Sequence, residues 1–332
     1  MAELVFVGCY TGDAGNGTGI TTFSRSASGA LEEVASLPLE SPSWLVRHPS
    51  LPVLYAANET STGSVTALSI STSGSLAVLG TLETGGAHPC HLAVTPDGRF
   101  LLCANYTGGS LAVFSLSSSG ALESRTALVQ HSGNGPDADR QEAAHVHMAV
   151  PGDGIVSAVD LGTDEIRSYT LSSSGALEPL AVSSLPAGTG PRQLVRRPGT
   201  DLAYVVGELA GTVVTVRETS PGAFSVESVT PSTLSSVTPN LVAHLELADA
   251  RMYVSNRGPD CVTEFALDDA AAVTDQPCGA NPRHFALVDG TCYVAAQSED
   301  AITAFTLTAS GEADLKYYPT GSPTFVLPVS LP

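Results

Sequence analysis

Lysine is almost absent from this sequence of 332 residues: Lys316 stands alone, and the other thirteen cationic side chains are arginines. Aspartate and glutamate together number 33, so the formal net charge is −19. A chain this acidic repels the phosphates of nucleic acids and the surfaces of anionic membranes. The composition therefore argues against nucleic acid and membrane partners.

Long apolar runs and paired cysteines are missing as well. No apolar run reaches the roughly 18 residues that a membrane-spanning helix needs. The opening stretch, MAELVFVGCY, lacks the basic region and the cleavage site of a secretory signal. The six cysteines show no C-x-x-C spacing and no short secreted frame, so we expect buried, reduced thiols. Together these absences predict a cytoplasmic protein.

What the sequence does contain is a repeated unit of two β-rich runs joined by a polar turn. A further short β-run precedes each unit, and a glycine-containing hairpin signal such as SASGAL or SSSGAL follows most of them. The period-2 alternation of Val, Leu, Tyr and Phe marks strands, and no long stretch shows the 3.6-residue period of a helix. The seven copies are VFVGCYT…GITTF, VLYAANETSTGSVTAL, LLCANYTGGSLAVF, IVSAVDLGTDEIRSY, AYVVGELAGTVVTV, MYVSNRGPDCVTEF and CYVAAQSEDAITAF.

Four strands per unit, at a period of about 40–55 residues, are typical of a β-propeller blade. The final run, TFVLPV, resembles an innermost strand without the rest of its blade, and the first run, ELVFVGCYT, resembles a second strand without its first. Joining them completes a blade and removes the exposed edges of an open ring. We therefore predict an all-β fold: one seven-bladed β-propeller domain over residues 1–332, closed by the C-terminal strand.

Two positions in each blade should face the same mouth of the central channel: the start (entrance) of the innermost strand and the end (exit) of the second strand. The two strands are antiparallel neighbours, so this start and this end lie side by side. Five of the eight histidines and three of the thirteen arginines fall at these positions. The entrances carry His91, His145, His147, Arg192, His244, Arg283 and His284. The exits carry Tyr10, Glu59, Tyr106, Leu161, Glu208, Arg257 and Gln297.

The two histidines of the segment HSGNGPDADRQEAAHVHMAV (131–150) stand two residues apart, so on a strand they point to the same side. We expect the polar residues 131–142 to form a loop over them. His-x-His is also half of a zinc site, but no further ligand motif accompanies it, and we expect no metal. Several of these polar groups could equally serve only to bond buried water or a neighbouring blade: Tyr10, Glu59, His91 and Tyr106.

The arginines are harder to explain as structural residues. A buried guanidinium is very costly unless it faces a carboxylate or an anionic ligand. Few carboxylates, chiefly Glu208, stand at equivalent positions around the ring. The surplus of Arg192, Arg257 and Arg283 therefore predicts a small anionic substrate held by planar, two-pronged hydrogen bonding.

At these residues the chain resembles the seven-bladed propeller lactonases, which include bacterial 6-phosphogluconolactonases of the propeller type and the fungal carboxy-cis,cis-muconate cyclases. The resemblance runs from about Val5 to Pro328. Apart from segment 131–150, it rests on DLGTDEI (160–166), GPRQL (190–194), GEL (207–209), YVSNRGPD (253–260), NPRHF (281–285) and AAQSED (295–300).

The resemblance implies a catalytic set of His147, Arg192, Glu208 and Arg257. It also implies a site role for Arg283, which we assign to substrate binding. From their places at the channel mouth we expect five further residues to bind the substrate: His145, Gln297, His244, Tyr106 and Glu59. The chain departs from the family pattern at three places. Gln193 replaces a histidine, Gly207 replaces an asparagine, and His244 precedes Glu246 where the family has the reverse order.

Lactone hydrolysis needs an activated water and positive charge near the developing oxyanion. Either His147 or Glu208 could be the base; the unperturbed pKa of a histidine suits proton transfer near neutrality. No G-x-S-x-G elbow and no nucleotide-binding loop occurs in the sequence. The leading hypothesis is a cofactor-free lactonase acting on 6-phosphogluconolactone. The alternatives are a lactone-forming cyclase or isomerase of a muconate-like diacid or specialised metabolite, and a non-catalytic binding scaffold.

Overall fold

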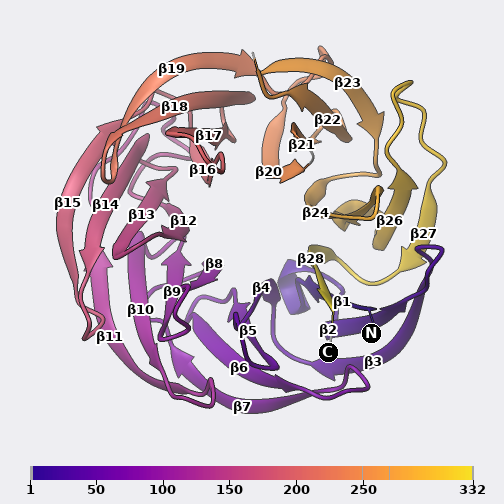
Figure 1. Cartoon of the computed structure of the whole chain (residues 1–332), viewed down its shortest axis with the longest axis horizontal. Helices are drawn as coiled ribbons and strands as arrows, with labels where there is room; N and C mark the ends of the chain where they lie inside the picture. Colours follow the sequence, from indigo (N-terminus) through magenta and orange to yellow (C-terminus); the bar gives the residue numbers. More distant parts are fainter. Residues whose placement is uncertain (1–2, 249, 269, 331–332) are drawn as a thin grey trace.

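The computed structural model describes residues 3–248, 250–268 and 270–330, which form seven four-stranded antiparallel sheets arranged in a ring (Figure 1). This confirms the predicted all-β propeller. Blade 1 comprises β4 (Pro42–Arg47), β5 (Val53–Asn58), β6 (Ser64–Ile70) and β7 (Leu76–Glu83). Blade 2 comprises β8 (Pro89–Val94), β9 (Phe100–Asn105), β10 (Ser110–Leu116) and β11 (Leu122–Gln130). Blade 3 comprises β12 (Val146–Pro151), β13 (Ile155–Asp160), β14 (Glu165–Leu171) and β15 (Leu177–Ser184).

The remaining blades follow the same order from the centre outward. Blade 4 comprises β16 (Pro191–Arg196), β17 (Leu202–Gly207), β18 (Thr212–Ser220) and β19 (Ala223–Pro231). Blade 5 comprises β20 (Leu241–Ala248), β21 (Arg251–Arg257), β22 (Cys261–Ala266) and β23 (Ala271–Pro277). Blade 6 comprises β24 (Pro282–Val288), β25 (Thr291–Ala296), β26 (Ala301–Thr306) and β27 (Lys316–Pro319). Blade 7 comprises β28 (Pro323–Ser330), β1 (Glu3–Cys9), β2 (Gly19–Arg25) and β3 (Leu31–Pro38).

Blade 7 closes the ring, as the sequence predicts. Strand β28 pairs with β1 in an antiparallel register that runs from Glu3 opposite Ser330 to Cys9 opposite Pro323. The chain's two ends therefore share one sheet (Figure 1). The hydrophobic core lies between neighbouring blades, where Leu4 and Phe6 of blade 7 pack with Leu54 of blade 1. The second strand of blade 1, β5, is consequently buried along its whole length, whereas the outermost strand β3 is mostly exposed.

The hairpins between the third and fourth strands of blades 2 and 7 are each bonded to a neighbouring blade. Gly29 and Gly120 adopt φ values of 79° and 81°, which the tight reversal requires and which glycine adopts without strain. Their carbonyl groups accept hydrogen bonds from tyrosines of the adjacent blade, Tyr293 Oη to Gly29 at 2.6 Å and Tyr55 Oη to Gly120 at 2.7 Å. The repeated S-x-S-G turn therefore serves inter-blade packing as well as chain reversal.

Helical structure is confined, in the described part of the chain, to two short 3-10 turns, η1 (Gly12–Ala14) and η2 (Gln297–Glu299). Among the described residues we find no helix with the length and apolar character needed to cross a membrane.

A β-bulge near the start of each innermost strand positions the functional residues. In blade 3, for example, Val146 pairs with Asp160 and Met148 with Val159, so His147 between them has no partner. The extra residue is released from the ladder and its side chain is redirected. Blade 5 has a longer bulge, in which Val242 and Leu245 are paired and two residues are skipped. The bulged residues around the ring are Ser43, Cys90, His147, Arg192, Ala243 with His244, Arg283 and Thr324.

Candidate active site

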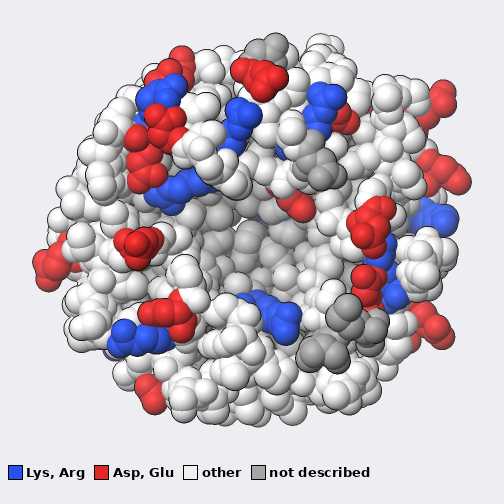
Figure 2. All heavy atoms as spheres, viewed as in Figure 1, with Lys and Arg blue, Asp and Glu red and all other residues white. Residues whose placement is uncertain are grey.

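The bulged residues and the strand exits surround a cavity of about 240 Å³. Figure 2 shows the molecule hollowed at the centre of the ring. Six blades contribute their bulged residue to the cavity wall, four contribute the residue that follows the second strand, and blade 5 contributes Arg257, the last residue of its second strand. The lining residues are Tyr10, Ser43, Trp44, Glu59, Cys90, Tyr106, Arg140, His147, Arg192, Glu208, Leu241, Arg257, Arg283 and Thr324.

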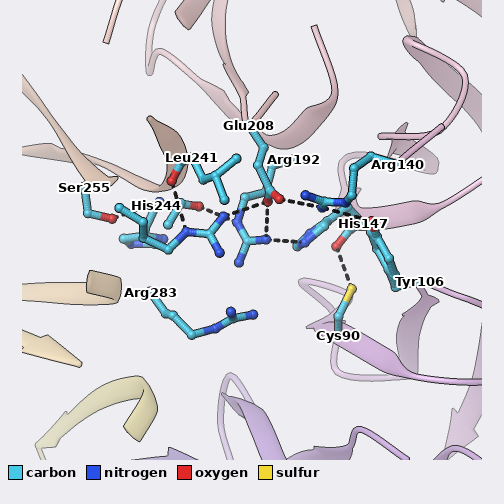
Figure 3. Close-up of polar contacts among 12 residues, drawn as sticks. Cys90, Tyr106, Arg140, His147, Arg192, Glu208, Leu241, His244, Ser255 and Arg283 are labelled. Carbon is cyan, nitrogen blue, oxygen red and sulfur yellow. Dashed lines mark hydrogen bonds and ion pairs between the residues drawn. The ribbon is translucent and has the colours of Figure 1, made fainter. Parts of the chain in front are cut away.

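Glu208 is the centre of the charged network in this cavity. Its Oε2 atom lies 2.7 Å from Arg192 Nη1 and 3.0 Å from Arg257 Nη2, and its Oε1 atom lies 2.8 Å from Arg140 Nη2 (Figure 3). Burial alone would raise the pKa of this carboxyl group, but the charges of Arg257 and Arg192 outweigh burial and hold the pKa well below its usual range. The carboxylate is therefore ionised and shared by three guanidinium groups.

His147 joins the network through its Nε2 atom, which lies 2.5 Å from Arg192 Nη1. Burial, together with the charge of Arg192, lowers the pKa of His147 well below its ordinary value. The imidazole is therefore neutral at neutral pH, and its Nε2 atom accepts a hydrogen bond from the guanidinium group of Arg192. We refer to Glu208, Arg140, Arg192, Arg257 and His147 as the Glu208 cluster.

Two members of the cluster are fixed by the main chain of blade 5. Arg192 donates from Nε to the carbonyl oxygen of Ala243 at 2.8 Å, and Arg257 donates from Nε to that of Leu241 at 3.0 Å. Burial lowers the pKa of Arg257 to about 9, so it keeps its charge at neutral pH. Its Nη2 atom is buried and makes no well-directed hydrogen bond, despite its proximity to Glu208, which leaves that donor available to a ligand.

Arg283 lies apart from the Glu208 cluster (Figure 3). It donates from Nη2 to Tyr10 Oη at 2.9 Å, and its guanidinium lies 5.0 Å from the centre of the Tyr10 ring. Tyr10 Oη in turn donates to Glu59 Oε1 at 3.0 Å. Arg283 is thus linked to a carboxylate only through a tyrosine.

The cavity wall carries more positive than negative charge. Its four arginines are opposed by two carboxylates, Glu59 and Glu208, which leaves a formal surplus of two positive charges. The Oγ atom of Ser43 is also buried there without a hydrogen-bond partner. In a chain whose net charge is −19, such a site is suited to a small anion with two negative charges.

Most of the residues predicted from the sequence lie in this wall, and three do not. Tyr106, Glu59 and Arg283 line the cavity together with the four residues of the implied catalytic set. His145, Gln297 and His244 lie outside the lining. Three further entrance and exit residues are absent from it as well: His91, His284 and Leu161. This corrects the expectation that all these positions share one surface. His145, Gln297 and His244 each support a neighbouring element instead.

His145 precedes the bulge of β12 and packs behind the wall. Its ring stacks on that of Tyr106 with centroids 4.5 Å apart, and its Nε2 lies 3.1 Å from Glu142 Oε1. Gln297 begins the turn η2, where its Oε1 accepts a hydrogen bond from Asn281 Nδ2 at 3.0 Å. The paired histidines that the sequence places on one face therefore lie on different sides of the cavity wall, because only His147 is the bulged residue.

His244 belongs to a layer of rings beneath the cavity, made by the residues around the bulges. The ring centroids of His244 and His284 lie 3.8 Å apart, and those of His284 and Phe325 also lie 3.8 Å apart. Burial lowers the pKa of both His91 and His244 to about 3, so these imidazoles are neutral. Gln193, which replaces the histidine of the family pattern, also belongs to this layer. Its Nε2 atom donates to His244 Nδ1 at 2.9 Å, and its Oε1 atom accepts a hydrogen bond from the main-chain N–H of Leu245 at 2.6 Å.

The other two departures from the family pattern also lie outside the cavity wall. A side chain at Gly207 would meet Thr189 and Thr212 at 3.0 Å or less, so glycine fits that packing. Glu246 is partly buried beside blade 6, where its Oε2 accepts the main-chain N–H of Leu287, and burial raises its pKa to about 7.

Sequence reasoning missed several lining residues, of which Arg140 and Cys90 are the most informative. Arg140 lies in segment 131–142, which we expected to cover the histidines without assigning a role to any of its side chains. Cys90 occupies the bulge position equivalent to His147, where the sequence pattern places its neighbour His91 instead. Burial raises the pKa of its thiol well above the ordinary value, so it is not a thiolate nucleophile.

Among the described residues, no three histidine, cysteine, aspartate or glutamate side chains lie close enough together to hold a metal ion. The cavity's own side chains offer three kinds of group: guanidinium donors that stabilise negative charge, a neutral imidazole that can take a proton, and an ionised carboxylate that orients the cations.

Comparisons with known proteins agree with the propeller fold. The family model described as "Lactonase, 7-bladed beta-propeller" matches residues 4–328. A 6-phosphogluconolactonase of Bacillus subtilis (strain 168) is 31% identical over 274 residues, which cover 79% of this chain and 77% of that protein. A 6-phosphogluconolactonase of Formosa agariphila is 27% identical, over 85% of this chain and 86% of that protein.

A solved structure, the periplasmic gluconolactonase of Pseudomonas aeruginosa, superimposes with a TM-score of 0.91 at 26% identity and covers 100% of both chains. The family match spans nearly the whole propeller, including every residue of the Glu208 cluster. This chain belongs to the seven-bladed β-propeller lactonase family.

Proposed function

We propose that this protein hydrolyses a small anionic lactone, and specifically 6-phosphogluconolactone to 6-phosphogluconate. The observation that carries the proposal is the surplus of two positive charges in the cavity wall, next to a neutral imidazole. A phosphate ester carries about −1.5 to −2 charges at neutral pH, which matches this surplus. A neutral lactone would leave the surplus uncompensated.

The relatives' names suggest two substrate classes. One relative is named a 6-phosphogluconolactonase and another a gluconolactonase, so related propellers are described with both phosphorylated and unphosphorylated substrates. The charge of this cavity supports the phosphorylated class. The small volume, about 240 Å³, suits a sugar-sized molecule rather than the larger ligands that occupy typical pockets of about 300–1,000 Å³.

In the proposed reaction, the lactone carbonyl oxygen binds the guanidinium groups of Arg257 and Arg192. Arg257 contributes the Nη2 donor that has no well-directed bond in the free protein. When Arg192 Nη1 donates to the lactone oxygen in place of His147 Nε2, while its bonds to Glu208 and Ala243 remain, His147 Nε2 is released and can accept a proton from a water molecule. The water oxygen attacks the carbonyl carbon, and the guanidinium groups stabilise the oxyanion that forms.

Collapse of the intermediate completes the hydrolysis. The bond between the carbonyl carbon and the ring oxygen breaks, and the imidazolium of His147 returns its proton to that oxygen, so the products are a carboxyl group and a hydroxyl group. Glu208 has a different role in this scheme. Because its pKa is held well below the usual range, it orients the arginines and does not act as the base.

The test is the rate of acid release from 6-phosphogluconolactone, measured above spontaneous hydrolysis. We expect clear catalysis by the wild-type protein and a roughly 100- to 1,000-fold loss of kcat in Arg257→Met, the size expected for removing one oxyanion donor. Arg217→Ala is the matched control, because Arg217 is an exposed arginine that pairs with Asp201 and Glu227 away from the cavity.

Two outcomes would contradict the proposal at different levels. If glucono-δ-lactone is hydrolysed and its phosphorylated form is not, the lactonase assignment stands and the substrate is wrong. If neither lactone is hydrolysed faster than in buffer, or if Arg257→Met is as active as the wild type, the assigned chemistry is wrong.

A further inference from the structure

We propose that Arg140 selects phosphorylated over unphosphorylated lactones, by turning its guanidinium from Glu208 to the phosphate at the cavity mouth. This inference rests on the proposed function and assigns its substrate preference to one residue. Arg140 is supplied by the long loop, residues 131–142, and not by any of the seven repeated positions that supply the other cations.

Arg140 differs from the other members of the Glu208 cluster in its exposure. Its side chain is 37% exposed, whereas those of Arg192 and Arg257 are 10% and 9% exposed. The latter two are also tied to main-chain carbonyl groups, while the side-chain hydrogen bonds described for Arg140 go to Tyr106 Oη and Glu208 Oε1. Arg140 is therefore the cation best able to change partners without disturbing the backbone.

The network tolerates the departure of Arg140. Glu208 accepts Arg140 on Oε1 and keeps both buried arginines on Oε2, so it would still face two positive charges. A phosphate with nearly two negative charges attracts the guanidinium more strongly than a carboxylate that is already shared. Guanidinium groups also match the geometry of phosphate oxygens.

The backbone of the long loop is anchored, so the change is confined to the side chain of Arg140. His131 is bonded through Nδ1 to Asp160 at 2.7 Å and through Nε2 to Tyr169 Oη at 2.8 Å, and the histidine and aspartate side chains are fully buried. At the other end of the loop, Gln141 Nε2 donates to the carbonyl oxygen of Leu161 at 2.8 Å. These contacts hold the loop against blade 3 and present Arg140 at the mouth.

The experiment compares 6-phosphogluconolactone with glucono-δ-lactone in the wild type, Arg140→Ala and Arg140→Lys. We expect kcat/KM for the phosphorylated lactone to fall roughly 10- to 100-fold in Arg140→Ala, the loss associated with one hydrogen bond to a charged group. The value for the unphosphorylated lactone should fall by a clearly smaller factor, so the readout is the ratio of the two kcat/KM values, which should fall roughly 10-fold or more. Arg140→Lys should recover part of the preference, because it keeps the charge but not the two-pronged geometry.

A merely structural role for Arg140 predicts a different pattern. If Arg140 only held Glu208 in place, both lactones would lose activity by the same factor in Arg140→Ala, and that result would overturn the inference. Arg217→Ala controls for the loss of any ion-paired surface arginine.

Failure of the proposed function can be told apart from failure of this inference. If the wild type hydrolyses neither lactone, binding of 6-phosphogluconate and gluconate is compared by calorimetry. Tighter binding of 6-phosphogluconate that is lost in Arg140→Ala supports the role of Arg140. Equal binding of the two acids, or an affinity unchanged by the substitution, contradicts it.

Discussion

A single carboxylate determines how the cavity presents its positive charge. Glu208 is 2% exposed and contacts three guanidinium groups, so it fixes their positions without neutralising them. Removing one partner of a buried ion pair typically costs about 3–5 kcal/mol, because the remaining charge is left uncompensated. Substituting Glu208 should therefore lower the stability of the fold as well as alter the proposed chemistry, and variants at this residue confound the two effects. His147 offers a cleaner test.

The pH dependence of the reaction should report His147 in two different environments. A base must be neutral, and burial with the charge of Arg192 lowers its pKa in the free protein, so the acid limb of kcat/KM should lie below pH 6.5. A bound phosphate adds negative charge nearby, which raises the pKa, so the acid limb of kcat should lie at higher pH. Rate profiles between pH 4 and 9 measure both limbs; a kcat limb at the lower pH would contradict His147 as the base.

At the scale of strands and loops, much of the structure could be predicted because the repeat is regular. The seven units, their hairpins and the closing strand follow from period-2 alternation and turn glycines, and each of these features is local in the sequence. The bulges are not local. That His147 enters the cavity while His145 packs behind Tyr106 depends on where the pairing with β13 shifts, which no residue pattern in β12 specifies.

The partners of the site residues were also beyond the sequence. The motifs single out Glu208 and two of the arginines that pair with it. The third such arginine, Arg140, lies 68 residues before Glu208 in the sequence, in an irregular loop. Its contact with Glu208 depends on the path of that loop over blade 3. For the same reason, Gln193 and His244 look like substitutions in the pocket, although they bond to each other beneath it.

The long loop should therefore influence substrate preference through its anchors. Gln141 is fully buried, and Gln141→Ala leaves the carbonyl oxygen of Leu161 without its donor, at a cost of about 1–3 kcal/mol. We expect a lower Tm and a several-fold higher KM for 6-phosphogluconolactone, because Arg140 is less well placed. Gln276→Ala is the control: Gln276 is equally buried and bonds Thr308, remote from the cavity, so its Tm should fall with KM unchanged. Equal KM changes in the two variants would contradict the link between loop and site.

On the scale of the whole molecule, the ring is what makes the cavity. The lining residues come from all seven blades and from positions 10 to 324 of the chain, so the site exists only when every blade is in register. The core clusters lie between adjacent blades, and each blade therefore depends on both of its neighbours. The stability of the ring should therefore depend on the contact that closes it, which is the pairing of β28 with β1.

Removing β28 should open the ring and abolish both folding and activity. Phe325, Val326 and Val329 of this strand are at most 5% exposed and belong to the core clusters on the two sides of blade 7. Burying each such side chain contributes roughly 1.5–3 kcal/mol. Their combined loss is comparable with the total stability of a typical domain, about 5–15 kcal/mol. A chain that ends at Gly321 should therefore lose its cooperative thermal transition.

Adding the missing strand in trans distinguishes loss of closure from general damage. A peptide with the sequence of residues 322–330 can pair with the exposed edge of β1 in the register of the intact chain, from Glu3 opposite Ser330 to Cys9 opposite Pro323. We expect this peptide to restore the thermal transition and lactonase activity of the shortened chain, and a scrambled peptide of the same composition to restore neither. A shortened chain that keeps the wild-type Tm without any peptide would show that the ring does not need the β28–β1 pairing, because the remaining inter-blade contacts then suffice.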